Sequence, residues 1–199
     1  MKVFLNNLFR SFSIVYIFFY LIGCSAHSQH LKITKSKQLS NNTCSQKKPL
    51  EIDITTHLGD NQTFIRGDKV RFLASTNQNA YLLLIYKNAN GEILQLIPSK
   101  TLGKGYYKER YYFEIPKSGS GFVFHISEPF GTELLELFAS SSEFPIFEGE
   151  TLNNGFIKLN SDFFYNKIKI LKEKSATNCL LFQKTNAHFY SVDTTIITQ

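Results

Sequence analysis

The sequence predicts an all-β fold, mainly an antiparallel two-sheet sandwich of the Ig-like type, with one accessory C-terminal helix. Short apolar runs follow one another from Pro49 onward, and clusters of turn residues separate them at regular spacing. Seven such runs favour a sandwich, because two sheets that are each apolar on one face can bury those faces against each other. One later segment has helical rather than strand spacing, and it supplies the helix.

The first strands are predicted at residues 50–54 and 69–74. Apolar and charged residues alternate in the first segment, and Val70, Phe72 and Ala74 occupy every second position of the other. This alternation is expected of a half-buried strand, because successive side chains point to opposite faces of a sheet.

A continuous apolar run at residues 81–87 predicts a strand that is buried on both faces. Residues 88–91, Asn-Ala-Asn-Gly, then turn the chain into a strand over 92–97. Asn-Gly between two such runs is a strong hairpin signal. Further strands are predicted over 110–115, 122–127 and 133–139.

The helix is predicted to begin at Asn160-Ser161-Asp162, residue types that suit an N-cap. The positions that then repeat at helical spacing are Phe163, Phe164, Lys167, Ile168 and Leu171. Two closing strands are expected after the helix, over 180–182 and 188–198. Residues 49–147 are thus predicted to form the β-sandwich domain, and residues 148–199 to add the helix and closing strands to the same domain.

The N-terminus has the layout of a lipoprotein signal peptide over residues 1–23. Lys2 and Arg10 supply a positive region, and residues 12–22 an apolar core. Leu21-Ile22-Gly23-Cys24, at the end of this apolar core, resembles a lipobox. The resemblance implies that Cys24 is acylated and becomes the first residue after cleavage. An uncleaved transmembrane anchor is the alternative, although the apolar part falls short of the roughly 20 residues that a span needs.

Residues 24–48 predict a flexible basic tether, because Ser, Asn, Gln and Lys dominate them. The tether could lie against anionic lipid head groups or act as a solvated spacer. Residues 1–48 hold seven of the 22 Lys and Arg residues and none of the 16 Asp and Glu residues, so the rest of the chain is close to neutral. A nucleic-acid binder would carry its positive charge on the folded domain, so no nucleic-acid partner is expected.

The chain contains three cysteines, and the lipid is predicted on Cys24. Cys44 and Cys179 remain as candidates for one disulfide, since an exported chain enters an oxidising compartment in many bacteria. Two unpaired thiols are the alternative.

Several turn and strand-end residues recur in a fixed order along the predicted sandwich. They are Phe64-x-x-Gly67-Asp68-x-Val70-x-Phe72, Asn77 followed by Tyr81-Leu82, Gly91, Leu96-x-Pro98, Ile115-Pro116, Pro129-Phe130-Gly131 and Ala139-Ser140. This pattern resembles the bacterial domain of unknown function 4384 over roughly residues 50–147. The resemblance implies an envelope or exported β domain that is often joined to other modules, and it implies no reaction.

The sequence contains no Gly-x-Ser-x-Gly, His-Glu-x-x-His, P-loop or Cys-x-x-Cys motif, so no cofactor or metal is expected. His57 with Asp60 and His125 with Glu128 are the candidate acid–base pairs. Each pair is better explained by a turn or by the exposed side of a strand.

Residues 104–112, Lys-Gly-Tyr-Tyr-Lys-Glu-Arg-Tyr-Tyr, are the strongest binding candidate in the sequence. Tyrosine combines a large apolar face with a hydroxyl, so this segment could stack on a sugar ring or anchor a protein partner. The alternative is that alternate tyrosines pack into the core while the basic residues face water. The predicted contact residues are Tyr106, Tyr107, Lys108, Arg110, Tyr111 and Tyr112.

These features predict a lipid-anchored binding or assembly module of the cell envelope without catalytic activity. The expected partners are the membrane, through the lipid, and another envelope protein or the cell-wall glycan. An envelope hydrolase with an unrecognised site is the alternative. Ser25 after Cys24 predicts the outer membrane, facing the periplasm, if the host is Gram-negative.

We expect Cys24→Ser to leave an unprocessed precursor, because the substitution removes the thiol that would be acylated. Labelled palmitate should then be incorporated into the wild-type chain and not into the variant. Persistent labelling of the variant would contradict the lipoprotein interpretation.

Overall fold

The computed structural model describes residues 48–193. The predicted signal peptide, Cys24, Cys44 and the tether up to residue 47 lie outside the described residues, as do residues 194–199. In chain order the elements are β1 (Ile52–Thr56), β2 (Thr63–Ile65), β3 (Lys69–Val70), β4 (Phe72–Thr76), β5 (Ala80–Lys87), β6 (Ile93–Ile97), β7 (Tyr106–Tyr107), β8 (Arg110–Ile115), β9 (Phe124–His125), β10 (Gly131–Ser140), β11 (Glu150–Thr151), β12 (Ile157–Leu159), α1 (Ser161–Thr177) and β13 (Phe182–Val192).

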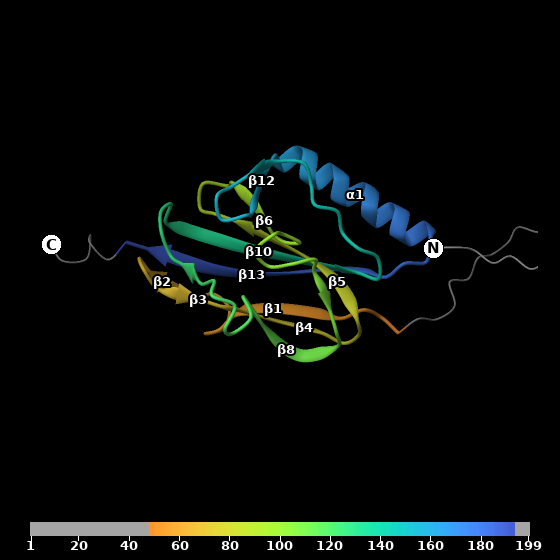
Figure 1. Ribbon diagram of the computed structural model, residues 1–199, viewed down its shortest axis with the longest axis horizontal. Coiled ribbons are helices and arrows are strands. Elements are labelled where there is room, and N and C mark those ends of the chain that lie inside the picture. The colour runs from red at the N-terminus through yellow and green to blue at the C-terminus, as the bar shows by residue number, and fades with distance from the viewer. Residues whose placement is uncertain (1–47, 194–199) are drawn as a thin grey trace, which may run out of the picture. The chain divides into compact units, whose positions relative to one another are not determined.

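Most strands belong to one large sheet with the order β11-β12-β6-β5-β10-β13-β2, to which β7 is attached beside β5. A smaller sheet has the order β1-β4-β8, and β3 pairs with β9. In Figure 1, α1 lies along one face of the large sheet and β1, β4 and β8 lie along the other. The predicted sandwich of mainly antiparallel strands with one C-terminal helix is confirmed.

The central strands of the large sheet are buried on both faces, as the apolar run at residues 81–87 predicted. Leu82 and Leu84 belong to the core between the two sheets, whereas Leu83 and Ile85 belong to a second core beneath α1. All four side chains are fully buried. The run has no polar alternation because each face of β5 is covered by another layer.

The helix begins where the sequence predicted. Asn160 has an extended backbone, and its side-chain oxygen accepts a hydrogen bond of 2.9 Å from the Phe163 amide. Phe164 and Ile168 then turn toward the large sheet and are buried in the core beneath the helix. Phe163 remains exposed, with the Lys167 ammonium 5.1 Å from its ring centroid.

Four predicted strands, over 69–74, 122–127, 180–182 and 188–198, differ from the observed ones. The segment 69–74 is split, since β3 pairs with β9 while β4 pairs with β1 and β8. Within residues 122–127 only β9 is a strand. The closing segment is one strand, β13, with residues 180–181 before it, because ten of its residues pair with β10 from Gly131↔Ser191 to Ser140↔Phe182.

The described chain enters the fold beside the β4–β5 connection. The side-chain amide of Gln78 donates to the backbone carbonyl oxygens of Lys48 (3.2 Å) and Pro49 (3.1 Å). The side-chain amide of Asn77 also donates to the carbonyl oxygen of Pro49 (3.0 Å). These bonds hold Lys48 and Pro49 beside the connection between β4 and β5.

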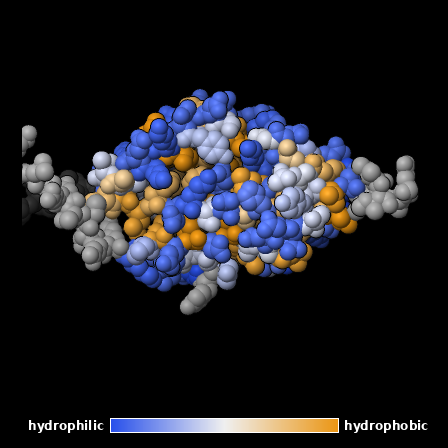
Figure 2. All heavy atoms as spheres, turned by 180° about the vertical axis from the view of Figure 1, so that it is seen from behind, coloured by the Kyte–Doolittle hydropathy of each residue, from blue (hydrophilic) through white to orange (hydrophobic). Residues whose placement is uncertain are grey.

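The surface of the described part mixes polar and apolar residues. Figure 2 shows hydrophobic patches set among hydrophilic side chains on the face opposite to the view of Figure 1. Within residues 48–193, no helix combines the length and the apolar character that crossing a bilayer would require.

Phe189 connects β13 to the rest of the core, and we expect its removal to be costly. Its side chain is 1% exposed, and its ring centroid lies 5.7 Å from Phe64 and 6.2 Å from Phe72. Phe189→Ala should lower the free energy of unfolding by about 3–5 kcal/mol in urea denaturation, because it leaves a cavity. The control is Tyr190→Ala at the next position, 40% exposed, which should change it by about 0.5 kcal/mol or less. Equal losses in both variants would contradict this assignment.

Candidate functional site

The predicted tyrosine segment passes from one sheet to the other. Tyr106 and Tyr107 form β7, which pairs with Tyr81 and Ala80 of β5, whereas β8 pairs with β4 in the smaller sheet. Gly105 permits the close approach of β7, because a Cβ there would stand 2.5 Å from the Leu82 carbonyl oxygen. Its own carbonyl oxygen accepts a hydrogen bond of 2.7 Å from the Leu82 amide.

The tyrosines of this segment have different environments. Tyr106 and Tyr112 are 50% and 58% exposed, and the Tyr106 ring packs against Tyr81 at 5.1 Å. Tyr107 is half-buried and stacks on Phe113 at 4.4 Å, and burial raises the pKa of its hydroxyl. Tyr107 therefore packs as the core alternative predicted, whereas Tyr106 and Tyr112 are exposed and their binding role stays a prediction.

The basic residues of the segment, Lys104, Lys108 and Arg110, are exposed. Tyr111 belongs to β8, but the placement of its side chain is not described. The connection between β7 and β8 is held by a hydrogen bond of 3.0 Å from the Glu109 amide to the Asn79 side chain.

A shallow groove runs along this segment, and we call it the tyrosine groove. Its exposed lining residues include Lys104, Tyr106, Lys108, Arg110, Tyr112 and Lys117. Glu114 also lines the groove, and its carboxylate pairs with Arg71 at 3.1 Å. The groove therefore combines two exposed tyrosines with an excess of positive charge.

A second hollow, which we call the phenylalanine pocket, lies near the other end of β5 and has a volume of about 390 Å³. This size falls in the usual range of small-molecule sites. Its aromatic wall contains Phe72, Phe122, Phe124, Phe156 and Phe189. The ring centroids of Phe72 and Phe124 are 5.0 Å apart, and those of Phe122 and Phe156 are 5.3 Å apart.

The floor of the phenylalanine pocket is polar. Glu133 of β10 is 2% exposed, and the Tyr86 hydroxyl donates a short hydrogen bond to its Oε2 atom. Burial raises the pKa of Glu133, although hydrogen bonds from Ser191 and Tyr86 oppose this shift. Burial, followed by the hydrogen bond to Glu133, raises the pKa of Tyr86 above its usual range. Tyr86 therefore stays protonated and acts as a hydrogen-bond donor.

Glu133 has no cationic partner, in contrast to Glu136 three residues later. Glu136 faces α1, accepts a hydrogen bond of 2.5 Å from the Tyr165 hydroxyl and pairs with the Lys184 ammonium. Among residues 48–193, no lysine or arginine forms an ion pair with Glu133. A buried acid without a cation is costly unless it is protonated or a ligand supplies the charge.

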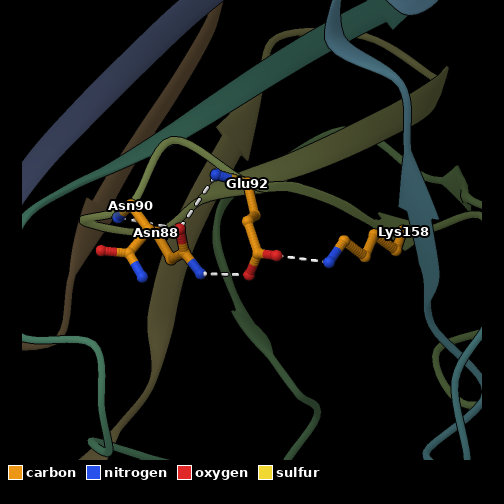
Figure 3. Close-up of polar contacts among 4 residues, drawn as sticks. All are labelled: Asn88, Asn90, Glu92 and Lys158. Atoms are coloured by element: carbon orange, nitrogen blue, oxygen red, sulfur yellow. Dashed lines mark hydrogen bonds and ion pairs between the residues drawn. The ribbon is translucent and has the colours of Figure 1, made fainter.

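The rim of the phenylalanine pocket is shaped by the β5–β6 turn, where Asn88 is the central residue (Figure 3). Its side-chain oxygen accepts from the amides of Asn90 (3.1 Å) and Glu92 (3.0 Å), and its side-chain nitrogen donates to Glu92 (3.0 Å). Glu92 also pairs with Lys158 of β12, and these contacts lower the pKa of its carboxyl. The network ties β12 to the turn, and Asn154 before β12 adds to the rim.

The candidate acid–base pairs of the sequence do not form among the described residues. The Glu128 carboxylate pairs with Arg66 at 3.1 Å, while His125 is exposed and its Nδ1 lies 3.4 Å from the Gly67 carbonyl oxygen. His57 accepts a hydrogen bond of 3.3 Å from the Arg71 amide. Residues 48–193 also contain no group of three His, Cys, Asp or Glu side chains that could hold a metal ion.

Cys179 follows α1 and is disulfide-bonded, with a positive φ of 54°. The predicted partner, Cys44, lies outside the described residues, so the Cys44–Cys179 pairing stays a prediction.

Sequence reasoning missed Tyr86 and Glu133. The available signal was an acidic residue on the same face of β10 as Leu135, Leu137 and Ala139, which face the core between the two sheets. An acid in that series marks either a surface-facing end of a strand or a buried site.

We expect Glu133→Gln to stabilise the protein at neutral pH. Because burial raises the folded-state pKa of this carboxyl, its contribution to stability is fully present below the usual value of 4.5 and is lost as pH rises through the folded-state pKa. The neutral amide avoids that loss, which is about 1.4 kcal/mol for each tenfold change in the ionisation constant of the acid. Thermal unfolding from pH 4 to 8 should therefore show a gap between variant and wild type that widens with pH.

The matched control is Glu136→Gln, which loses the ion pair to Lys184 and should be destabilised at neutral pH. If Glu133→Gln were less stable than the wild type throughout this range, the interpretation of Glu133 as a destabilising buried acid would be wrong.

Comparison with known proteins finds one family model that matches part of this chain. Residues 63–143 match the family model described as Domain of unknown function (DUF4384), which agrees with the resemblance predicted from the sequence. No curated protein and no solved structure gave a match. The matched range extends from β2 past the end of β10 and contains Tyr86, Glu133 and the tyrosine segment. Residues 63–143 are therefore similar to the DUF4384 family, over less than half of the chain.

Proposed function

We propose that this chain is a lipid-anchored binding and assembly module of the cell envelope that acts without catalysis. The lipid at Cys24 would hold the domain at a membrane, which is the outer membrane facing the periplasm if the host is Gram-negative. The partner that the tyrosine groove fits best is an acidic segment of another envelope protein.

The observation that carries this proposal is the pair of exposed tyrosines within a basic groove. Tyr106 and Tyr112 expose half or more of their surface, although each has a large apolar ring. Tyrosine and arginine are enriched among the residues that dominate binding energy at interfaces. The lysines and Arg110 around them would attract an acidic partner and raise its association rate.

The local structure supports a preformed surface. β7 is paired with β5, and β8 is paired with β4, so both tyrosines stand on hydrogen-bonded strands rather than on a free loop. A rigid surface loses less conformational entropy on binding than a mobile one.

An envelope hydrolase is the second candidate, and the phenylalanine pocket is what favours it. A buried acid with a raised pKa in a pocket is a recognised mark of active sites. The pocket supports catalysis less well than binding, because the raised pKa of Tyr86 keeps its hydroxyl protonated, so it is not available as a base, and Glu128 is engaged by Arg66. An acid–base mechanism would need a second group beside Glu133.

We expect Tyr106→Ala and Tyr112→Ala each to weaken binding of the envelope partner by about fivefold or more, which corresponds to about 1 kcal/mol. The melting temperature should stay close to that of the wild type, because both side chains are exposed. The partner would be identified by cross-linking in cells from a photoreactive residue at Lys108, and then titrated as a purified protein by calorimetry.

Two controls separate binding from packing. Tyr107→Ala should lower the melting temperature, because its ring packs on Phe113, and Tyr190→Ala should affect neither property. Full binding by both Tyr106→Ala and Tyr112→Ala would reject the groove as the contact. Cross-linking to cell-wall glycan alone would replace the protein partner with a glycan.

A further inference from the structure

The phenylalanine pocket places a buried carboxyl group among aromatic rings without a cation. Glu133 lies on its floor, and the Tyr86 and Ser191 side chains are its hydrogen-bond donors. A carboxylate can accept about four hydrogen bonds, so two donors leave capacity for a ligand.

Four phenylalanine rings that pack on one another line the same pocket as this carboxyl group. Phe72 and Phe124 pack at 5.0 Å, Phe122 packs edge-on against Phe124 at 5.0 Å, and Phe156 stacks on Phe124 at 6.0 Å. Aromatic faces attract ammonium groups, and the attraction grows when the cation is removed from water. The rings also offer apolar contact to the rest of a ligand.

We propose that the phenylalanine pocket binds a small amine with an apolar body, whose ammonium group pairs with Glu133 and whose body lies among the phenylalanine rings. Charge complementarity selects this ligand over a carboxylic acid of the same size, which would meet a like charge or compete for the same donors. It also selects the amine over a neutral alcohol, which would leave the Glu133 charge uncompensated.

The other titratable groups around the pocket do not supply the missing charge. His125 and Glu128 line the mouth, and Glu128 is paired with Arg66. The Tyr86 hydroxyl donates a hydrogen bond to Glu133 from β5, and Ser191 contributes a neutral hydroxyl from β13. Ionisation of Glu133 is therefore coupled to amine binding, and affinity rises as pH increases through the pKa of this carboxyl.

The test is calorimetric titration of the complete mature protein with three probes of one shape: 2-phenylethylamine, 2-phenylethanol and 3-phenylpropionate. At pH 7.5 the amine should bind at least tenfold more tightly than the alcohol, and the acid should bind most weakly. Equal affinity for the amine and the alcohol, or no binding of the amine, would overturn the proposal. This comparison uses the unmodified protein, so it decides the matter whether or not a variant folds.

Two variants locate the selectivity. Glu133→Gln should reduce amine affinity to that of the alcohol and abolish its rise between pH 5 and 8. Glu148→Gln, which changes an exposed acid outside the pocket, should retain both the preference and the pH dependence. A preference for the amine that survives in Glu133→Gln would assign the charge to another group and reject this site.

The amine site lies apart from the tyrosine groove, so the two proposals fail separately. Loss of 2-phenylethylamine binding in Glu133→Gln should leave binding of the envelope partner unchanged. Tyr106→Ala should weaken the partner and leave the amine titration as in the wild type.

Discussion

The burial of β5 and β10 on both faces is the constraint on which the rest of the structure depends. Leu82 to Ile85 alternate between the core under the smaller sheet and the core under α1, and Leu137 and Phe138 of β10 do the same. Each of these side chains contributes about 1.5–3 kcal/mol when it leaves water. Neither face can therefore stay open, and the chain has to provide a sheet for one side and a helix for the other. The capped helix after Asn160 and the β1-β4-β8 sheet meet those two requirements.

The same alternation decides what the two acids of β10 can do. Glu133 falls on the face toward the smaller sheet, and Glu136 falls on the face toward α1. Each receives a tyrosine hydroxyl, from Tyr86 and Tyr165 respectively, but Lys184 reaches only Glu136. Glu136 is thus a satisfied structural group, because its charge is paired. Glu133 lies in a hollow of the core with no cationic partner among residues 48–193, and this asymmetry is the reason for assigning a ligand to one acid and not to the other.

The fold could be predicted from local patterns wherever a pattern reflects burial. The apolar run at 81–87, the Asn-Gly hairpin and the Asn160 cap all specify their elements through nearby residues. β13 was divided in two because its middle, Gln183 to Asn186, is polar and mostly exposed, and its strand state depends on pairing with β10. The tyrosine segment could be found from composition, but its division into exposed and packed rings needs the partner Phe113. The pair of Tyr86 and Glu133 could not be found, since 47 residues separate the two side chains in sequence.

The C-terminal strand β13 contributes structural features that residues 63–143, the range of the family match, do not contain. β13 lies outside residues 63–143, yet it stands between β10 and β2 and is the partner of β2 in the large sheet. Phe189 of β13 forms part of the pocket wall, and Ser191 donates to Glu133. Both contributions come from residues beyond the family match. The phenylalanine pocket is therefore a property of this chain with its own C-terminal extension, and a shared match over β2 to β10 is not sufficient to assign the same site to another protein. Such an assignment would require a strand in the place of β13 with an aromatic residue and a hydroxyl on the same face.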